Sequence, residues 1–262
     1  MARYCSLYSG SKGNCYYIGS SGRGLIIDAG VSCKSVVTAL KNNNIDLSTI
    51  DGILITHEHS DHIKGLKPII NYFKCPVYST KDTLEYLTEK GKIPSDAQTE
   101  VIKDNMSIGT FKVKSFPTPH DCYSSTGYRF TASDNTIITH VTDLGHVTET
   151  VESNLKGSDM VILESNYDPN LLKISSYPYY LKQRIKSNHG HLSNNQCAEE
   201  VLKLVKNGTS RIMLAHLSRE NNNPTLAKQT TADILEKNGF KKDIDYMLYI
   251  AGADTPSELI II

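Results

Sequence analysis

The chain has 262 residues, of which 39% are hydrophobic and 21% charged, and this ordinary globular composition excludes a disordered or fibrous protein. Lysine plus arginine and aspartate plus glutamate each number 28, so the zero net charge gives no general signal for a nucleic-acid binder, although a local basic patch is compatible with it. No segment is of signal-peptide type and no apolar run could span a bilayer, so we expect a cytoplasmic protein without a membrane partner.

Three short strands are predicted at the start of the chain, at residues 4–7, 16–18 and 25–27. The tight loop at residues 9–14 joins the first two, either as a plain hairpin turn or as a frame for a functional site. Asp28 ends the third strand. A carboxylate at the end of a buried strand needs a polar partner, so Asp28 either orients a nearby imidazole or forms a simple turn.

The densest group of polar side chains lies in the stretch Thr56-His57-Glu58-His59-Ser60-Asp61-His62, where five ionisable side chains occupy six consecutive positions. An apolar run precedes this stretch and predicts a buried strand. Residues i and i+2 of an extended chain point to the same side, so His57 and His59 can hold one metal ion. Asp61 and His62 follow the turn of the chain and suit a second ion. The alternative is that these are ordinary surface histidines. The metal site is favoured, because so many desolvated ligand groups in one short stretch need a shared partner.

The rest of the chain alternates between strands and helices. Further strands are expected at residues 51–56, 77–79, 101–102, 106–108, 111–116, 127–131, 136–142, 160–163, 211–215 and 246–250. Helices are expected at residues 32–43, 65–73, 80–90, 148–155, 178–187, 193–206 and 225–238. The apolar tail at residues 259–262 needs a groove or a strand partner. Because no low-complexity linker interrupts this pattern, we expect residues 1–262 to form a single domain of two β-layers flanked by helices.

More polar side chains stand where later β-runs end. His120 follows a strand that is broken by prolines, and Asp143 and His216 each follow an apolar run. We interpret His140 as structural, because it lies within a strand. His146 precedes a helix, and a place in the helix start is favoured over a role as a ligand.

Taken in order, the early Asp, the H-x-H-x-D-H motif and the later His, Asp and His resemble the metallo-β-lactamase fold superfamily over the whole chain. The resemblance implies an α+β fold, a four-layer αββα sandwich, that holds two divalent metal ions (zinc, manganese or iron) per chain. The ligands that it implies are His57, His59 and His120 for one ion, Asp61, His62 and His216 for the other, and Asp143 as the bridge. Asp28 would orient a ligand from behind. Secreted β-lactamases use Cys where Asp143 stands, so a β-lactamase activity is not expected.

The finer resemblance is to the YycJ/WalJ-type branch of cytoplasmic bacterial proteins. It is carried by Ser9-Gly10-Ser11-Lys12-Gly13-Asn14, Thr142-Asp143-Leu144-Gly145-His146, Gly190-His191-Leu192-Ser193-Asn194, His216-Leu217-Ser218 and Glu220-Asn221-Asn222-Asn223-Pro224. The branch implies a dinuclear phosphodiesterase, a 5′→3′ exonuclease on DNA that uses a metal-bridging hydroxide. An RNA-processing nuclease and a small-molecule hydrolase of a thioester, lactone or cyclic phosphodiester are the alternatives. A non-catalytic metal-binding scaffold ranks last, because no ligand is missing.

In this hypothesis Asp61, Asp143 and His191 are the catalytic residues. His191 precedes a helix N-terminus and can donate a hydrogen bond to the phosphate, or it is merely a neighbour of the helix cap. Three tyrosines and three basic residues lie between positions 177 and 186, and they form the candidate contact with nucleic acid, with DNA favoured. An ordinary solvated helix with core-facing tyrosines is the alternative. The candidate substrate-binding residues are Ser193, Lys182 and Arg184.

Overall fold

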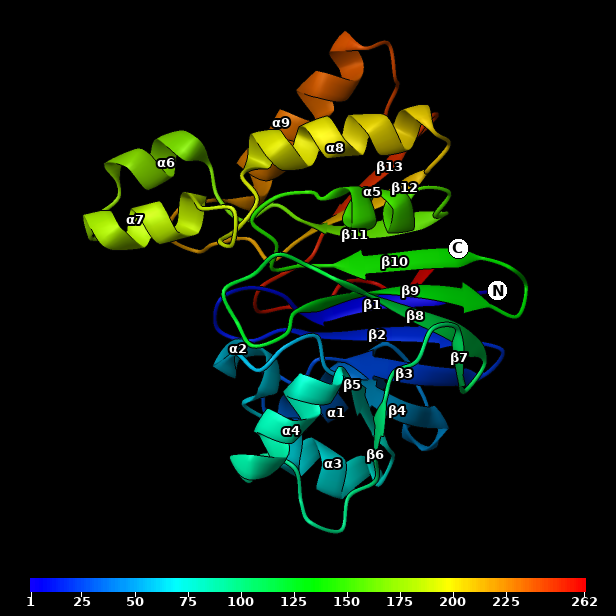
Figure 1. Cartoon of the computed structure of the whole chain (residues 1–262). Helices are drawn as coiled ribbons and strands as arrows, with labels where there is room; N and C mark the ends of the chain where they lie inside the picture. Colours follow the sequence, from blue (N-terminus) through cyan, green and yellow to red (C-terminus); the bar gives the residue numbers. More distant parts are fainter.

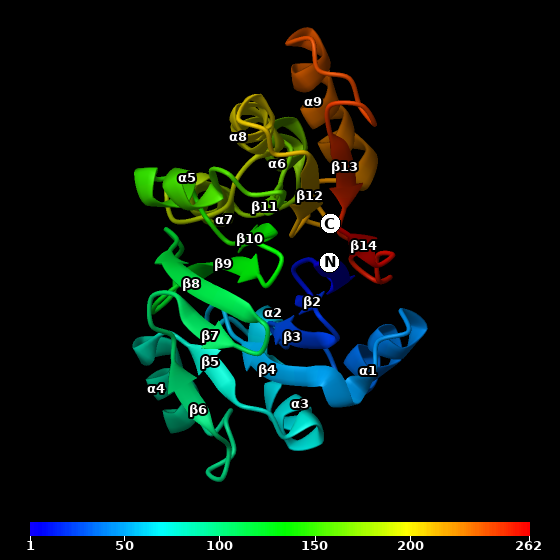
Figure 2. The ribbon, with the colours of Figure 1, turned by 90° about the vertical axis from the view of Figure 1, so that its right-hand side faces the viewer.

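Two seven-stranded sheets lie face to face in the middle of the computed structural model, which describes residues 1–262, and helices cover their outer faces (Figure 1). Figure 2 shows the same layers from the side, with α1, α3 and α4 below the sheets and α8 and α9 above them. The expected four-layer αββα sandwich is therefore confirmed.

The first sheet comes from the N-terminal half of the chain and is completed by the C-terminal tail. Its strand order is β14-β1-β2-β3-β4-β5-β6. The strands are β1 (Arg3–Tyr8), β2 (Cys15–Ser20), β3 (Arg23–Ile27), β4 (Ile50–Leu54), β5 (Val77–Ser79), β6 (Thr99–Val101) and β14 (Ile260–Ile261). Ile260 pairs with Tyr4, so the apolar tail has the strand partner that its sequence requires.

Helices from the same half of the chain accompany this sheet. They are α1 (Cys33–Asn42), the short 3-10 helix η1 (Leu47–Thr49), α2 (Ser60–Ile63), α3 (Leu66–Phe73) and α4 (Lys81–Glu89). The side chains of Ser32 and Thr80 accept hydrogen bonds from backbone N–H groups in the first turns of α1 and α4. These caps fix where the two helices begin.

The second sheet has the strand order β13-β12-β11-β10-β9-β8-β7. Its strands are β7 (Met106–Ile108), β8 (Phe111–Pro117), β9 (Thr126–Ala132), β10 (Ile137–Val141), β11 (Met160–Glu164), β12 (Arg211–Ala215) and β13 (Met247–Ile250). Its outer face is covered by α5 (Glu149–Leu155), α8 (Asn194–Lys206) and α9 (Pro224–Lys237). Ser193 and Gln196 form a capping box at the start of α8.

Two further helices, α6 (Pro169–Ile174) and α7 (Tyr179–Lys186), project from the side of the sandwich, at the left of Figure 1. We call residues 169–186 the α6–α7 arm. The sequence analysis did not predict α6. Asp168 caps its first turn and Pro169 occupies its first position, which suits proline because no N–H is needed there.

Three apolar cores hold the four layers together. One lies between the sheets, a second lies between the first sheet and α1, α3 and α4, and a third lies between the second sheet and α5, α8 and α9. Side chains of successive strand residues point to opposite faces, so Tyr4 and Tyr16 enter the core between the sheets, while Cys5 and Tyr17 enter the core under the helices. No helix of the chain has both the length and the apolar character that crossing a bilayer requires.

The parallel strands define one edge of the sandwich. β3 pairs in parallel with β4 in the first sheet, and β10, β11 and β12 are parallel in the second. The carboxyl ends of parallel strands meet at the same edge of a sheet. Polar residues that directly follow these strands are therefore brought together.

Candidate metal centre

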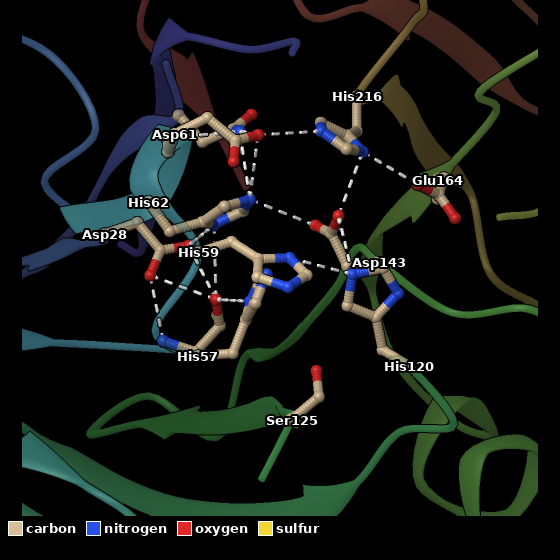
Figure 3. A network of polar contacts seen from close by, with 12 residues as sticks. Asp28, His57, His59, Asp61, His62, His120, Ser125, Asp143, Glu164 and His216 are labelled. Atoms are coloured by element: carbon tan, nitrogen blue, oxygen red, sulfur yellow. Dashed lines mark hydrogen bonds and ion pairs between the residues drawn. The ribbon is translucent and has the colours of Figure 1, made fainter. Parts of the chain in front are cut away.

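The predicted ligands gather at this edge, between the two sheets (Figure 3). Both expected groups form, each with potential ligand atoms within 4.8 Å of one another: His57, His59 and His120 in the first, and Asp61, His62 and His216 in the second. Each group combines residues from the segment after β4 with one residue that follows a strand of the second sheet, His120 after β8 and His216 after β12. The centre therefore requires both halves of the chain.

The loop after β4 serves both groups because it turns at His59. This residue is the N-cap of α2 and is still extended, with φ −61° and ψ 146°. His57 and His59 stand before the turn, and their ring centroids lie 4.7 Å apart. Asp61 and His62 lie within the first turn of α2. The backbone therefore agrees with the expectation that His57 and His59 face one group of potential ligands, and that Asp61 and His62 face the other.

Asp143 lies between the two groups and is 2% exposed. One carboxylate oxygen is 3.3 Å from Nε2 of His62. The other is 3.3 Å from Nδ1 of His216 and 3.8 Å from Nε2 of His120. Its carboxylate thus approaches a histidine of each group, which is the position that a bridging ligand requires.

Three site residues share an unusual backbone conformation at the ends of their strands. Asp28, Asp143 and His216 have φ angles of 59°, 56° and 54°. For residues other than glycine this left-handed region costs about 1–3 kcal/mol each and is found mostly where the surrounding structure enforces it. Here it accompanies the turn that each chain segment makes as it leaves its strand at the site.

Asp28 orients an imidazole, which is one of the two roles that the sequence left open. Its Oδ2 lies 2.7 Å from Nδ1 of His62, and both side chains are fully buried. The same carboxylate accepts hydrogen bonds from the backbone N–H and the hydroxyl of Thr56. The Thr56 oxygen lies 3.0 Å from Nδ1 of His57 and accepts from it, since its own proton goes to Asp28. Nε2 of His57 is therefore free to coordinate.

Two other histidines are fixed in the same way. Nδ1 of His120 lies 3.1 Å from the carbonyl oxygen of Gly190, and Nδ1 of His216 lies 2.8 Å from Oε1 of Glu164. Carbonyl and carboxylate oxygens only accept, so both rings donate through Nδ1. Such anchoring through the second nitrogen is typical of metal-ligating histidines.

The centre contains buried ligand atoms without partners. Nε2 of His57, Oδ2 of Asp143 and Nε2 of His216 are buried and make no hydrogen bond. Each such atom costs about 1–3 kcal/mol unless something satisfies it. Imidazole nitrogens and carboxylate oxygens are ligands of zinc, manganese and iron. The donor set therefore fits divalent metal ions.

Burial and charge set the protonation of these histidines. Burial and neighbouring imidazoles hold the pKa of His57 well below its usual value, and burial also lowers the pKa of His120. Burial opposes a charge on His62 and His216 as well, but Asp143 and the other carboxylates outweigh it. They raise the pKa of His62 well above its usual value and that of His216 to about 10. The carboxylates thus draw positive charge, which a divalent ion would supply in place of protons.

Glu164 is an important residue of the site that the sequence analysis did not select. It ends β11, is fully buried, and its Oε1 lies 2.8 Å from Nδ1 of both His191 and His216. Burial alone would raise its pKa, but the two imidazoles outweigh burial and lower the pKa of Glu164 to about 2. The available signal was the one that pointed to Asp28: a carboxylate at the end of a buried strand.

The loop at residues 9–14 frames the centre, so the second of its two interpretations applies. Asn14 is fully buried, and its side-chain Nδ2 lies 3.3 Å from Oδ2 of Asp61 and 3.0 Å from Nε2 of His62. The backbone N–H of Asn14 donates to the carbonyl oxygen of Asp61. Gly30 permits this approach, because a Cβ there would lie 1.7 Å from the same carbonyl oxygen. An ion at His62 would take the place of the Asn14 amide.

The three candidate substrate-binding residues all have partners within the chain. The Ser193 hydroxyl belongs to the capping box of α8. Nζ of Lys182 donates to the carbonyl oxygens of Lys173 and Ser175 at the end of α6. Arg184 pairs with Asp121, the residue after His120. The two cations therefore hold the α6–α7 arm together and tie it to the centre.

Tyr177 is half-buried, but the other two tyrosines of this stretch do not face a core. Tyr179 and Tyr180 are 78% and 73% exposed, so the alternative of an ordinary helix with core-facing tyrosines does not describe them.

His140 is buried in β10 and its Nδ1 lies 2.9 Å from the hydroxyl of Tyr4, which agrees with the structural role expected for it. His146 precedes the Thr148 cap of α5 and joins no group of potential ligands.

The fold and the centre define a class of protein. The family model described as a beta-lactamase superfamily domain matches residues 23–217. The chain therefore belongs to the metallo-β-lactamase fold superfamily, as its motifs indicated. It is a metal-dependent hydrolase.

Two relatives place the chain in the YycJ/WalJ branch of this superfamily. The chain is 36% identical to the exodeoxyribonuclease YycJ of Bacillus anthracis, over 89% of each chain. It is 34% identical to the exodeoxyribonuclease WalJ of Streptococcus pneumoniae serotype 2, over 98% of this chain and 97% of the relative.

Solved structures of low sequence identity share the fold. YhfI from Bacillus subtilis matches with a TM-score of 0.74 at 15% identity, over 98% of both chains. PqqB from Methylobacterium extorquens matches with a TM-score of 0.71 at 14% identity, over 98% of this chain and all of the other.

Proposed function

We propose that this chain is an exonuclease that cleaves phosphodiester bonds of DNA with the help of two divalent metal ions. The observation that carries the proposal is the position of Asp143 between two complete groups of potential ligands. Similarity to two exodeoxyribonucleases, at 36% and 34% identity, supports nucleic acid as the substrate. The 5′→3′ direction is the one that the branch resemblance implies.

The ligand roles in this proposal follow the two groups. His57, His59 and His120 would hold one ion, Asp61, His62 and His216 would hold the other, and Asp143, which lies between the two groups, would be available to both. Bound divalent ions would lower the pKa of a coordinated water and offset negative charge on the phosphate. Zinc and manganese both suit these ligands. We further propose that residues 1–262 act as one domain, because each group draws on both sheets.

His191 is the candidate for contact with the phosphate or the leaving oxygen. Its side chain is 20% exposed, whereas those of His216 and Asp143 beside it are 3% exposed. Glu164 accepts from its Nδ1, so Nε2 is the nitrogen that can hold a proton toward a substrate. The carboxylate therefore positions the His191 ring.

The test offers the metal-loaded protein 5′-labelled and 3′-labelled DNA, single-stranded and duplex, together with RNA and a small phosphodiester. We expect single nucleotides to be released from the 5′ end of DNA. His59→Ala and Asp143→Ala should abolish this release, because each removes a ligand. Glu200→Gln, which alters a buried carboxylate on the outer helix α8, is the control and should cut normally.

Other results would redirect the assignment. Release from the 3′ end would remove the proposed direction alone. Cleavage of only the small phosphodiester would mark a small-molecule hydrolase and contradict the nuclease proposal. His191→Ala should keep its bound metal while turnover falls, and a loss of metal from this variant would show that His191 is a ligand instead.

A further inference from the structure

A shallow cavity of about 370 Å³, wide open to solvent, adjoins the candidate metal centre, and its lining is distinct from the two ligand groups. The residues that line it are Glu58, Asp121, Cys122 and Tyr123. Glu58 stands between His57 and His59 in the sequence, and Asp121 follows His120. The cavity thus lies directly beside the first group of ligands.

One wall of the cavity carries two carboxylates. Glu58 is only 9% exposed; its Oε1 accepts from the backbone N–H of Tyr123 at 2.8 Å, while its Oε2 is buried without a partner. Asp121 has one oxygen 3.5 Å from Nε2 of His120, and its other oxygen pairs with Arg184. The unpartnered oxygen of Glu58 can accept a hydrogen bond from a ligand, whereas both carboxylates repel an anion.

The other walls are aromatic and neutral. Tyr123 is 72% exposed, and its ring centroid lies 5.0 Å from that of Tyr86 at an interplanar angle of 38°. Nζ of Lys90 lies 5.7 Å from the Tyr86 ring, and neither residue lines the cavity. Cys122, which is partly buried, completes the lining.

A ligand that suits this cavity is planar, uncharged and rich in N–H donors. A nucleobase has these properties. We infer that the cavity binds the base of the nucleotide whose phosphate lies at the metal centre. This inference rests on the proposed function and identifies the base as the part of the substrate that the cavity recognises.

The two kinds of wall read different properties of the base. The Tyr123 ring can stack on any base. The Glu58 oxygen can accept from the exocyclic amino group of cytosine or adenine, whereas thymine and guanine present a carbonyl oxygen at the matching position. The phosphate, repelled by the carboxylates, stays on the side of the potential metal ligands.

The test measures equilibrium binding of dCMP, dTMP and deoxyribose 5-phosphate to the metal-loaded full chain. We expect dCMP to bind about tenfold more tightly than dTMP, from the hydrogen bond to Glu58. Tyr123→Ala should weaken dCMP and dTMP about tenfold each, with the loss confined to compounds that carry a base. Tyr123→Phe keeps the ring and should bind as the wild type does.

Two more variants complete the design. Glu58→Gln should remove the preference for dCMP over dTMP, because it offers an N–H group as well as an oxygen, while its oxygen can still accept from the Tyr123 backbone. Tyr72→Ala is the matched control: Tyr72 is 52% exposed on α3 and does not line the cavity, so its loss should change nothing.

Equal affinities of the wild type for the three compounds would overturn the inference. So would an equal loss for dCMP and deoxyribose 5-phosphate in Tyr123→Ala, which would mark a structural role of the ring. Because these are binding measurements, they decide the matter whether or not DNA is cleaved. Cleavage of DNA without base-dependent binding would leave the proposed function standing and remove this inference alone.

Discussion

Replacement of Glu164 by glutamine tests whether one buried carboxylate aligns two histidines of the centre. Its Oε1 accepts from Nδ1 of His191 and His216, and its Oε2 accepts from the backbone N–H groups of Leu144 and Leu192. Glutamine has one acceptor oxygen and one donor group. Whichever way the amide is turned, two buried donors lose their acceptor.

The size of the effect follows from this count of lost acceptors. Each loss costs about 1–3 kcal/mol, so the free energy of unfolding should fall by about 2–6 kcal/mol. A folded domain has only about 5–15 kcal/mol in total. If the amide oxygen stays on the backbone N–H groups, His216 loses its orientation, and the affinity for metal should fall about 10–100-fold.

Urea denaturation of the metal-free protein measures the first effect, and competition with a chelator measures the second. Glu200→Gln is the matched control. Glu200 is 3% exposed, but its oxygen lies 2.9 Å from Nζ of Lys203 on the same helix, away from the centre. This variant should keep the metal affinity of the wild type. Unchanged unfolding energy together with unchanged metal affinity in Glu164→Gln would refute the reasoning.

Two other substitutions give independent checks. Asp28→Asn should lower metal affinity about 10–100-fold in the same chelator competition, because His62 loses the carboxylate that fixes its Nδ1; an affinity equal to that of the wild type would show that Asp28 only shapes the turn. Burial lowers the pKa of His140 to about 3. In the unfolded chain the imidazole of His140 has a pKa near 6.5, so it takes up a proton as the pH falls below 6.5. In the folded chain it stays neutral. The free energy of unfolding should therefore be about 2 kcal/mol lower at pH 5 than at pH 8 on account of this residue. His140→Gln should lose that part of the difference in urea unfolding at the two pH values, and an unaltered difference would contradict a neutral buried His140.

The order of the elements could be predicted because its signals are local. Ser32, Thr80, Thr148 and Ser193 each cap the helix that their position indicated. The geometry of the H-x-H-x-D-H stretch is also local. The chain is extended at His57 and His59 and helical at Asp61 and His62, so the two pairs of ligands point to different sides. The short helix α6 was missed because six residues carry little periodicity.

Contacts between distant segments could not be predicted in the same way. Glu164 lies 27 and 52 positions from His191 and His216. The parallel pairing of β11 with β12 brings His216 to Glu164, and the segment between α7 and α8 brings His191 there. Lys182 and Arg184 illustrate the same limit, and the substrate contact expected of them stays a prediction. Their charges suggested a substrate contact, but the fold pairs Arg184 with Asp121 and uses Lys182 to hold the end of α6. A sequence shows that a charge is present, but its partner is set by the tertiary structure.

The number and position of the bound ions decide whether the centre is dinuclear. Crystals of the metal-loaded chain, measured at the absorption edge of manganese or zinc, locate each ion by anomalous scattering. We predict two peaks about 3.5–4 Å apart, on either side of Asp143. The expected contacts are His57, His59 and His120 for one peak and Asp61, His62 and His216 for the other. A single peak, or two peaks away from these residues, would contradict the two-metal centre.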